Sequence, residues 1–423
     1  MEKWVIFGVV GLGVFAVAGL PSIPGEEAQE PTYASTIAPI LFEKCTPCHR
    51  PGQVAPFSLI SYEDAQRRSA TIARVVEKRY MPPWKATAGY GSFKHENRLT
   101  DEQINQIKIW HEAGAPRGDA KNEPVAPTFS AEWALGKPDL TVSADRDYKL
   151  AAEGEDVYRN FVIKTDFKEP RWIRAMDIAP GNRTVVHHVI AFLDEGDRAK
   201  GLEDQAKDGQ PGYESSGGGV GFMPNGALGG WAPGLQPFAT PKGSAFLLKP
   251  GTTIVLQVHY HKSGKAETDR TKLALYFAEE KIEKEMRLAW IANPFFRLDA
   301  GNANKSVNMS STIPFDATAY TAMPHMHMLG KSMTAWIELP DGKEVPLVQV
   351  KDWDFNWQLM YEFAKPVKIP AGSTIRATAL YDNSADNPRN PNQPPKEVRW
   401  GEQTTDEMAL LIVSYTRDAD VGK

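Results

Sequence analysis

The stretch Thr253-Ile254-Val255-Leu256-Gln257-Val258-His259-Tyr260-His261 has the alternation that decides the fold of most of this chain. Its even-numbered residues from Ile254 to Tyr260 are apolar or aromatic, whereas the odd-numbered ones include Gln257, His259 and His261. Successive side chains of a β-strand point to opposite faces. The pattern therefore predicts a strand that presents both histidines on one face.

Short alternating segments of the same kind recur through the C-terminal two thirds of the chain, bounded by glycines and prolines. Residues 273–277 are one example, and residues 408–416 form a last apolar strand. This pattern is typical of antiparallel sheets. We therefore predict all-β antiparallel sandwiches of jelly-roll-like type over residues 130–423. The glycine- and proline-rich region 213–251 is expected to be a long functional loop.

The motif Cys45-Thr46-Pro47-Cys48-His49 predicts one covalently attached haem c. In C-x-x-C-H the two thiols form thioethers to the haem vinyl groups, and the adjacent imidazole becomes the proximal iron ligand. Cys45 and Cys48 are the only cysteines of the chain. A redox dithiol or a structural disulfide is the alternative, but neither explains the histidine that follows directly.

A haem that transfers electrons takes a second axial ligand, and a thioether sulfur raises its potential. We predict Met81 for this role, because it stands in Arg79-Tyr80-Met81-Pro82-Pro83-Trp84. Paired prolines favour a rigid extended loop that can present one side chain. His95 and His111 are the alternatives, although His111 falls inside a helical pattern.

The segments around the haem motif have helix signals. Ser61-Tyr62-Glu63-Asp64 resembles a capping box before a helix that runs to about Arg79, and Thr100-Asp101-Glu102-Gln103 begins another. We therefore predict a small all-α domain over residues 30–118 that resembles a class I cytochrome c. Residues 119–129, rich in alanine, proline and polar residues, are expected to be a linker.

The N-terminus has the layout of a secretory signal peptide. Lys3 precedes an apolar stretch, and Ala16-Val17-Ala18 supplies a small-x-small cleavage site, so residues 1–18 are expected to be removed during export. The alternative is an uncleaved anchor over residues 4–20, near the lower length limit for crossing a bilayer. We expect a periplasmic or otherwise exported protein, bound to a membrane only if this segment is retained.

Length and charge set further limits on domains and partners. With 423 residues the chain is long enough for several domains, each with its own core. Its formal net charge of -5, without a long basic run, argues against nucleic acid as a partner.

Six of the nine histidines fall in three close pairs, which are His187-His188, His259-x-His261 and His325-x-His327. Clusters of this kind indicate metal ligands. Residues i and i+2 of a strand share a face, so His325 and His327 can bind one ion without distortion. The adjacent His187 and His188 need a strand end or a bulge for both to bind the same ion.

The residue types near these pairs favour copper. Met323, Met326, Met328 and Met408 accompany the histidines, and a thioether beside imidazoles suits copper that cycles through Cu(I). A motif with carboxylates next to the histidines, as in hydrolytic zinc or non-haem iron sites, is absent from the sequence.

Four strings resemble, in their order along the chain, the copper type II ascorbate-dependent monooxygenases. This family includes peptidylglycine α-hydroxylating monooxygenase and dopamine β-monooxygenase, and the resemblance spans roughly residues 130 to 423. The strings are Val186-His187-His188-Val189, Leu256-Gln257-Val258-His259-Tyr260, His325-Met326-His327-Met328-Leu329-Gly330-Lys331 and Asp406-Glu407-Met408.

The resemblance implies two copper ions, each in its own sandwich, with a domain boundary near residue 285. The electron-transfer copper of domain 130–285 would be held by His187, His188 and His259. The oxygen-binding, catalytic copper of domain 286–423 would be held by His325, His327 and Met408. His261 has no counterpart in the family pattern, and is a spare polar residue, a substitute ligand or a proton donor.

The sequence departs from the family in two ways. The peptidylglycine enzyme binds a substrate carboxylate with an arginine, an asparagine and a tyrosine. At the matching positions this chain has Met323, Leu410 and Ile412. An apolar substrate is therefore expected. Family members are also held by several disulfides, whereas no cysteine is left here after haem attachment.

These observations predict an exported haem- and copper-containing monooxygenase that hydroxylates a C–H bond of a small apolar substrate with O2. Electrons are expected to enter through the fused cytochrome from a periplasmic cytochrome, a quinol-linked donor or an ascorbate-like donor. The alternative is an electron-transfer or copper-handling protein without oxygen chemistry. Reduction of nitrite or nitrous oxide is disfavoured, because no cysteine remains for a blue-copper or dinuclear copper site.

Overall fold

The structure of this protein is a computed structural model that describes residue 1 and residues 30–420, except residues 54, 130–132 and 216–218. The expected signal peptide and its cleavage site lie outside the described residues, apart from Met1. Within the described part, no helix is both long enough and apolar enough to cross a bilayer.

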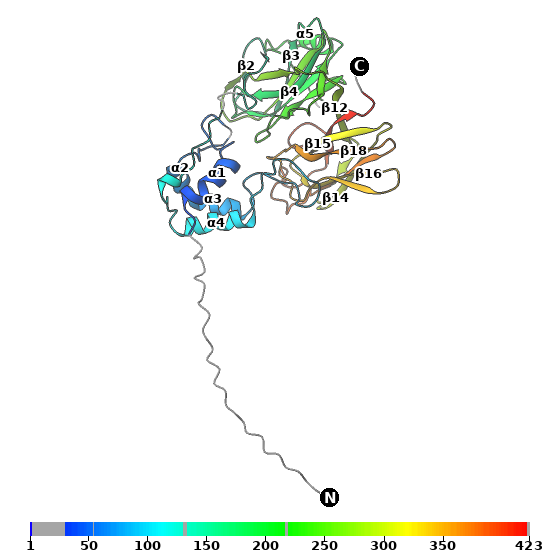
Figure 1. The fold of residues 1–423 in the computed structure, drawn as a ribbon. Coiled ribbons are helices and arrows are strands. Elements are labelled where there is room, and N and C mark those ends of the chain that lie inside the picture. The colour runs from blue at the N-terminus through cyan, green and yellow to red at the C-terminus, as the bar shows by residue number, and fades with distance from the viewer. Residues whose placement is uncertain (2–29, 54, 130–132, 216–218, 421–423) are drawn as a thin grey trace.

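The N-terminal part of the chain is helical, at the blue and cyan end of the ribbon in Figure 1. Its elements are η1 (Tyr33–Ile37), α1 (Ala38–Lys44), α2 (Tyr62–Arg67), α3 (Ser69–Glu77) and α4 (Asp101–Glu112), and the short η2 (Ala120–Asn122) follows in the expected linker. The helices η1 and α1 to α4 share one hydrophobic core, in which Leu41, Ile107 and Trp110 are fully buried. Burial of these apolar side chains is what holds such short helices in place.

Both helix starts expected from the sequence are present. The Ser61 side chain accepts the backbone N–H of Asp64, and Thr100 forms a reciprocal capping box with Gln103. The first helix is interrupted at Arg68, whose φ of -113° and ψ of 8° are not helical. Two short helices, α2 and α3, therefore replace the single helix expected there.

The described residues from 133 onward are mostly in β-structure, as expected, and among them one more helix is present, α5 (Arg198–Gln205). One sheet consists of β3 (Val157–Lys164), β5 (Val186–Asp194), β6 (Tyr213–Glu214), β7 (Gly226–Trp231) and β9 (Thr253–Tyr260). A second consists of β1 (Leu140–Ser143), β4 (Arg171–Ala179), β8 (Ser244–Leu248), β11 (Lys272–Phe277), β12 (Lys284–Ala292), β15 (Ala317–His325), β18 (Tyr361–Ile369) and β21 (Leu410–Arg417). A third consists of β14 (Lys305–Thr312), β16 (Gly330–Glu338), β17 (Glu344–Val350) and β19 (Thr374–Tyr381).

The order of the strands shows how these sheets are built. The five-stranded sheet has the order β6-β3-β9-β5-β7, the eight-stranded sheet β1-β11-β4-β8-β12-β21-β15-β18, and the four-stranded sheet β14-β19-β16-β17. Two short ribbons pair β2 (Tyr148–Leu150) with β10 (Glu267–Asp269), and β13 (Arg297–Leu298) with β20 (Val398–Arg399).

Two hydrophobic cores divide the β part into two units. The first β unit packs the five-stranded sheet against β1, β4, β8 and β11, around residues such as Ile173, Val189 and Leu256. The second β unit packs the four-stranded sheet against β12, β15, β18 and β21, around residues such as Met333 and Leu411. Each unit thus buries two sheets face to face, because each sheet has one apolar surface that must be covered.

The eight-stranded sheet runs through both units and joins them. β8 and β12 pair in parallel, with Ser244 opposite Lys284 and Ala245 opposite Glu285, and β12 continues the sheet into β21. The boundary expected near residue 285 therefore falls inside the strand that joins the units. Figure 1 shows the two units side by side, in green and in yellow to orange.

The helical part is attached to the second β unit by the segment 84–94. Ala86 forms an isolated antiparallel bridge with Val350, and Phe93 forms one with Phe363. Both Ala86 and Phe93 belong to the buried core of the second unit. Residues expected to lie in a separate cytochrome domain thus help to build the neighbouring β unit.

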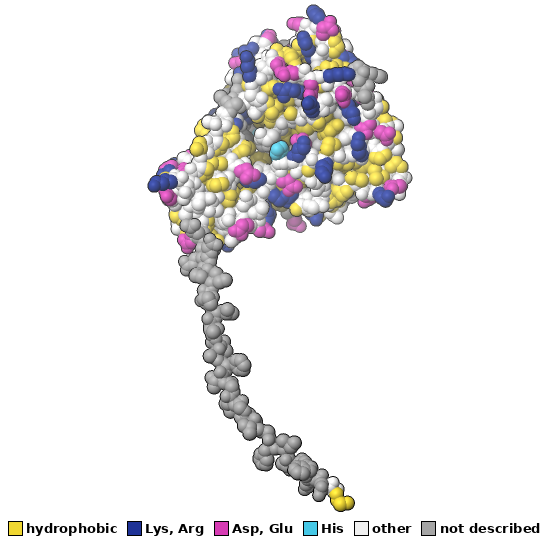
Figure 2. All heavy atoms as spheres, viewed as in Figure 1, with side chains coloured by type: hydrophobic (Ala, Val, Ile, Leu, Met, Phe, Trp, Pro, Cys, Tyr) yellow, Lys and Arg dark blue, Asp and Glu magenta, His cyan; other side chains and the backbone are white. Residues whose placement is uncertain are grey.

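The surface carries charges of both signs. On the face seen in Figure 2, Lys and Arg side chains are interspersed with Asp and Glu, and no large area has a single sign. This distribution agrees with the modest net charge of -5.

Candidate metal centre

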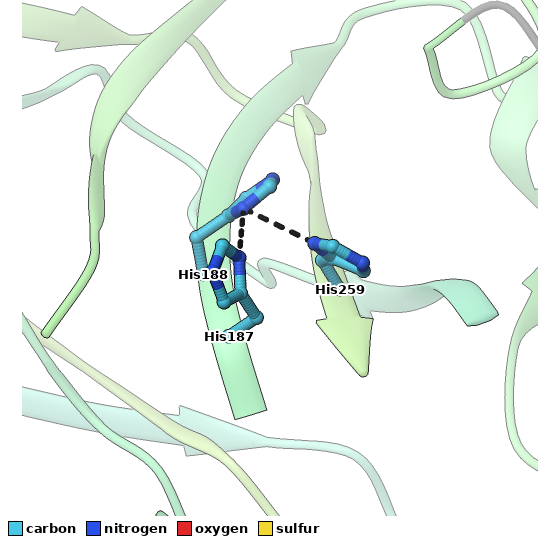
Figure 3. Close-up of side chains that lie close together, drawn as sticks. All are labelled: His187, His188 and His259. Carbon is cyan, nitrogen blue, oxygen red and sulfur yellow. Dashed lines mark hydrogen bonds between the residues drawn. The ribbon is translucent and has the colours of Figure 1, made fainter. Parts of the chain in front are cut away.

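Three histidines of the first β unit converge, and we call them the first histidine set: His187, His188 and His259. His188 on β5 stands directly opposite His259 on β9. The register between these strands shifts between Val186 and His188, so a bulge lies at His187. A bulge turns an extra side chain toward its neighbour's face. This is why two adjacent histidines can point to the same place, as Figure 3 shows.

The spacing of their nitrogens fits a metal ion. The Nδ1 atom of His188 lies 3.2 Å from Nδ1 of His187 and 3.3 Å from Nδ1 of His259. One ligand atom from each of the three residues lies within 4.8 Å of the other two. Nitrogens bound tetrahedrally at about 2.0 Å from an ion are about 3.3 Å apart. The first histidine set therefore has nearly the donor spacing that a bound metal requires.

Asp156 fixes the orientation of His259. Its Oδ2 lies 2.9 Å from Nε2 of His259, and Thr404 Oγ1 donates to the same oxygen at 2.5 Å. The ring of Tyr158 stacks on His259, with 4.3 Å between centroids and 9° between planes. When Nε2–H donates to the carboxylate, the lone pair of Nδ1 is left for a metal.

His261 lies on the outer side of the same carboxylate. Its Nδ1 is 2.9 Å from Oδ1 of Asp156, and its side chain is 69% exposed. It is not in the group whose donor atoms converge. Of the three roles that the sequence left open, a substitute metal ligand is the one that this position does not support.

Burial keeps the first histidine set neutral. Desolvation lowers the pKa of His187 to about 3, and the nearby imidazole of His259 acts in the same direction. The pKa of His188 lies far below its usual range for the same reason, with contributions from imidazoles of both sets. Neutral imidazole is the form that binds metal. These residues are therefore ready to bind metal at neutral pH.

Replacing Asp156 with alanine is expected to weaken metal binding by the first histidine set about 10- to 100-fold, the usual effect of losing a carboxylate that orients a histidine ligand. The affinity can be measured by titrating the metal-free protein with Cu(II) against a competing chelator. Asp166→Ala removes an exposed carboxylate of the same β unit and serves as the matched control. An Asp156 variant that binds copper as tightly as this control contradicts the role given to Asp156.

The second histidine set consists of His325 and His327, at the end of β15 and in the turn that follows. Both are buried, and their ring centroids are 5.3 Å apart. The Nδ1–H of His327 donates to the carbonyl oxygen of Asp406 at 3.1 Å, which leaves its Nε2 free for a metal. Burial lowers the pKa of His325 to about 4, so this imidazole is also neutral at neutral pH.

The turn after β15 is held by a buried carboxylate, that of Glu407. Its oxygens accept the backbone N–H groups of His327 at 2.8 Å and of Leu329 at 2.5 Å. Burial raises the pKa of Glu407 to about 8, against the effect of the N–H groups, which favour the ionised form. Glu407 thus shapes the loop that carries His327.

Met408 lies beside this turn. One carboxylate oxygen of Glu407, Oε2, accepts the backbone N–H of His327 at 2.8 Å and the backbone N–H of Met408 at 3.2 Å. The described contacts of Met408 involve its main chain, whose carbonyl accepts the hydroxyl of Tyr381 at 2.7 Å. The structure thus brings the Met408 backbone to the second histidine set.

The two histidine sets are neighbours, although they come from different β units. The centroids of His188 and His325 are 6.4 Å apart. Phe355 lies between the sets: its ring stacks on His187 at 4.8 Å and meets the ring of His327 edge-on at 5.8 Å. The sequence leads us to expect two separate centres, whereas here the imidazoles are grouped in one region.

The expected haem-attachment residues follow α1 in a tight turn. The backbone N–H of His49 donates to the carbonyl of Cys45 at 2.9 Å, and the thiols of Cys45 and Cys48 are free rather than joined in a disulfide. The imidazole Nδ1–H of His49 donates to the carbonyl of Phe57 at 3.2 Å. This leaves Nε2 of His49 for an iron ion and fits the expected proximal ligand.

Met81 lies after α3, at a cis peptide bond to Pro82, and is partly buried. Of the two alternative axial ligands, His111 accepts or donates a 3.0 Å hydrogen bond with Ser69 between two helices, and His95 is exposed. Among the described residues, no hydrogen bond, ion pair or ring contact joins any of these three side chains to His49. Met81 therefore stays a prediction.

Four contacts at the site were not expected from the sequence. Asp156, Tyr158, Thr404 and Phe355 lie outside the strings that resemble the monooxygenases. Tyr158 touches His259 because it stands opposite it in the ladder of β3 and β9. A cross-strand neighbour of this kind is visible only when the register is known.

Comparisons with known proteins give no family for this chain. No family model matches the sequence, and no curated protein does. Among solved structures, PNGF-II is matched with 10% identity and a TM-score of 0.28, over 67% of this chain and 66% of that one. The VP2 subviral particle of infectious bursal disease virus is matched with 12% identity and a TM-score of 0.18, over 70% of this chain and 80% of that one. Likenesses at this level place the chain in no fold family.

Proposed function

We propose that this protein is an exported copper-dependent monooxygenase-like oxidoreductase, fused to a class I cytochrome c module with covalent haem. The observation that carries this proposal is the convergence of three Nδ1 atoms from His187, His188 and His259 at separations of 3.2 and 3.3 Å. The second histidine set lies directly beside them. The two β units would correspond to two jelly-roll-like sandwiches, each providing one set of ligands.

In this proposal the chain provides ligands for two copper ions. His187, His188 and His259 would hold one copper, and His325, His327 and Met408 would hold the other. Copper bound by these residues would supply one-electron transfer and activation of dioxygen for hydroxylation of a C–H bond. Asp156 and the carbonyl of Asp406 would keep the tautomers of their histidines suited to metal binding.

The surroundings of the second histidine set support an apolar substrate. Met323 stands opposite Ile412, and Leu410 opposite His325, in the ladder of β15 and β21. The side chains of Met323, Leu410 and Ile412 cannot pair with a substrate carboxylate. A small apolar compound would leave no polar group buried without a partner at these positions.

The haem would deliver electrons to the copper ions. Cys45, Cys48 and His49 would hold it, with Met81 as the second axial ligand, and a periplasmic cytochrome or a quinol-linked or ascorbate-like molecule would serve as donor. The helical part is attached to the second β unit through Ala86 and Phe93. A fixed attachment of this kind suits a built-in electron source better than a flexible tether does.

The proposal is tested first by metal content. Copper-loaded full-length protein is expected to contain two copper ions and one haem per chain, with electron spin resonance signals of cupric ions bound by nitrogen. Oxygen uptake is then measured against a panel of small apolar compounds, together with the hydroxylated products. Copper binding without any hydroxylated product favours an electron carrier or copper-handling protein. Binding of zinc in place of copper rejects both the monooxygenase and this alternative.

Loss of the haem ligand His49 is expected to stop reduction of the copper ions by the physiological donor. In His49→Ala the iron has no proximal imidazole, so a reduced periplasmic cytochrome or a quinol-linked donor should leave both coppers oxidised in stopped-flow absorption measurements. A small chemical reductant that reaches copper directly should reduce them as in the unaltered protein. Unchanged turnover of His49→Ala or Met81→Leu with the physiological donor shows that the relay does not operate.

A further inference from the structure

Two arginines lie where the helical part adjoins the first β unit, and we call them the arginine pair: Arg50 and Arg183. Arg50 directly follows His49, the expected haem ligand. Its Nε–H donates to the carbonyl of Pro47 within the haem motif at 3.3 Å, and its guanidinium lies 4.1 Å from the ring centre of Phe129. These two contacts keep the Arg50 charge beside the haem-attachment residues.

Arg183 belongs to the loop between β4 and β5, four residues before His187. The loop is fixed next to Arg183, because the backbone N–H of Asn182 donates to the carboxylate of Asp269 at 2.8 Å. The guanidinium of Arg183 lies 5.6 Å from the ring centre of Trp231 on β7. An aromatic face orients a guanidinium but does not neutralise its charge. The first β unit therefore presents an oriented cation next to the strand that carries His187.

The two guanidiniums are close enough for their charges to interact. Desolvation lowers the pKa of Arg183, the carboxylate of Asp177 opposes this effect, and the positive charge of Arg50 adds to it. Cys48 of the haem motif also lies within reach of the Arg183 charge. Like charges in a partly desolvated region repel each other. Arg183 thus extends from the first β unit toward the haem motif and shares one region with Arg50.

The arginine pair lacks a counter-ion in the part of the chain that the structure describes. Neither Arg50 nor Arg183 forms an ion pair with a carboxylate there. Both oxygens of Asp177 instead accept backbone N–H groups, each at 2.8 Å. Two neighbouring cations without a counter-ion are costly when they are partly removed from water. The pair is therefore suited to bind an anionic group that is not part of the polypeptide.

We propose that Arg50 and Arg183 bind a propionate carboxylate of the haem, so that the first β unit completes the haem site. This inference rests on the proposed function, because it requires haem attached at Cys45 and Cys48. Arginine forms paired, charge-assisted hydrogen bonds with a carboxylate, and a covalent haem brings two such groups to this part of the chain. The haem would lie between the helical part and the β unit that carries the first histidine set, a position that suits electron delivery to that set.

The test is the reduction potential of the haem in the full-length protein, measured by following haem absorption during a redox titration. A nearby positive charge favours the added electron, so Arg183→Gln is expected to lower the potential. Arg50→Gln should lower it as well. Arg183→Lys keeps the charge and is expected to restore most of the potential. Arg174→Gln removes an exposed guanidinium that lies 5.5 Å from the ring centre of Tyr276 in the same β unit, and it is the matched control.

The pH dependence of the potential gives a second readout. Without Arg183 the ionised propionate loses a stabilising partner, so its pKa rises and the potential of Arg183→Gln should vary more with pH than that of Arg174→Gln. Potentials of Arg183→Gln and Arg50→Gln that match the control at every pH overturn the inference and leave the proposed function standing. A potential of Arg183→Lys as low as that of Arg183→Gln also overturns it, because the charge then has no role. Absence of covalent haem from the unaltered protein overturns both the inference and the proposed function.

Discussion

Replacing His327 with alanine is expected to lower substrate-dependent oxygen uptake by at least about a hundredfold, because a metal ion contributes several kcal/mol to such a reaction. His327 is buried, its Nδ1–H is bound to the carbonyl of Asp406, and its Nε2 is the atom left for copper. The variant should contain one copper ion instead of two. The absorption spectrum of its haem should be unchanged, because the haem motif lies in the helical part.

Ser306→Ala is the control for this variant. Ser306 is exposed on β14 of the same β unit and belongs to neither histidine set nor the expected haem ligands, so its replacement should leave copper content and oxygen uptake unchanged. The measurements are copper content by elemental analysis and oxygen uptake with product formation in the same preparations. If His327→Ala keeps two copper ions and full activity, the second histidine set does not form the catalytic site.

The first histidine set was largely predictable from its sequence pattern. The alternation from Thr253 to His261 places His259 on a strand, and two adjacent histidines can share an ion only at a bulge or a strand end. The structure has that bulge between Val186 and His188. The pattern could not predict that Asp156 is the hydrogen-bond partner of the His259 imidazole. Asp156 lies in a loop about a hundred residues away in sequence, and only the tertiary structure brings it to Nε2 of His259.

The region 213–251 shows where composition misleads. Its many glycines suggest a long loop, yet residues Gly226–Trp231 form β7 and Ser244–Leu248 form β8. A side chain at Gly230 would come within 2.7 Å of the carbonyl oxygen of Val189, so close approach of β7 to β5 requires glycine there. Glycine in this strand serves strand packing, and composition alone does not distinguish that role from loop flexibility.

The boundaries between modules were the least predictable feature. The helices of the N-terminal part begin where capping residues indicate, because caps are local signals. In contrast, Phe93 packs beside Phe363 in the second β unit, a pairing across a separation in sequence that no local pattern encodes. The strand β12 likewise joins both units through pairing with β8 on one side and β21 on the other. Long-range pairing, rather than local propensity, decides these boundaries.

The metal-free protein is expected to lose stability steeply as the pH falls from about 6.5 toward 4. The folded-state pKa of His325 is lowered from 6.5 to about 4 by burial, whereas the unfolded chain takes up a proton near the ordinary value. Between these two values the unfolded state binds more protons, so the free energy of unfolding decreases as the pH falls. His325 alone contributes about 3 kcal/mol to this loss, at 1.36 kcal/mol for each unit of pKa. His187, whose pKa is lowered to about 3, adds to it.

Urea unfolding at a series of pH values measures this dependence. His325→Gln keeps a polar side chain that does not titrate, so the difference between its pH profile and that of the unaltered protein isolates the contribution of one imidazole. The unaltered protein should lose more stability than the variant between pH 6.5 and 4, by about 3 kcal/mol. Copper should oppose the loss, because it binds the folded state and competes with protons for the same nitrogens. Parallel profiles for the two metal-free proteins would show that His325 is not held neutral by burial, which would remove the physical basis for treating the second histidine set as ready to bind metal.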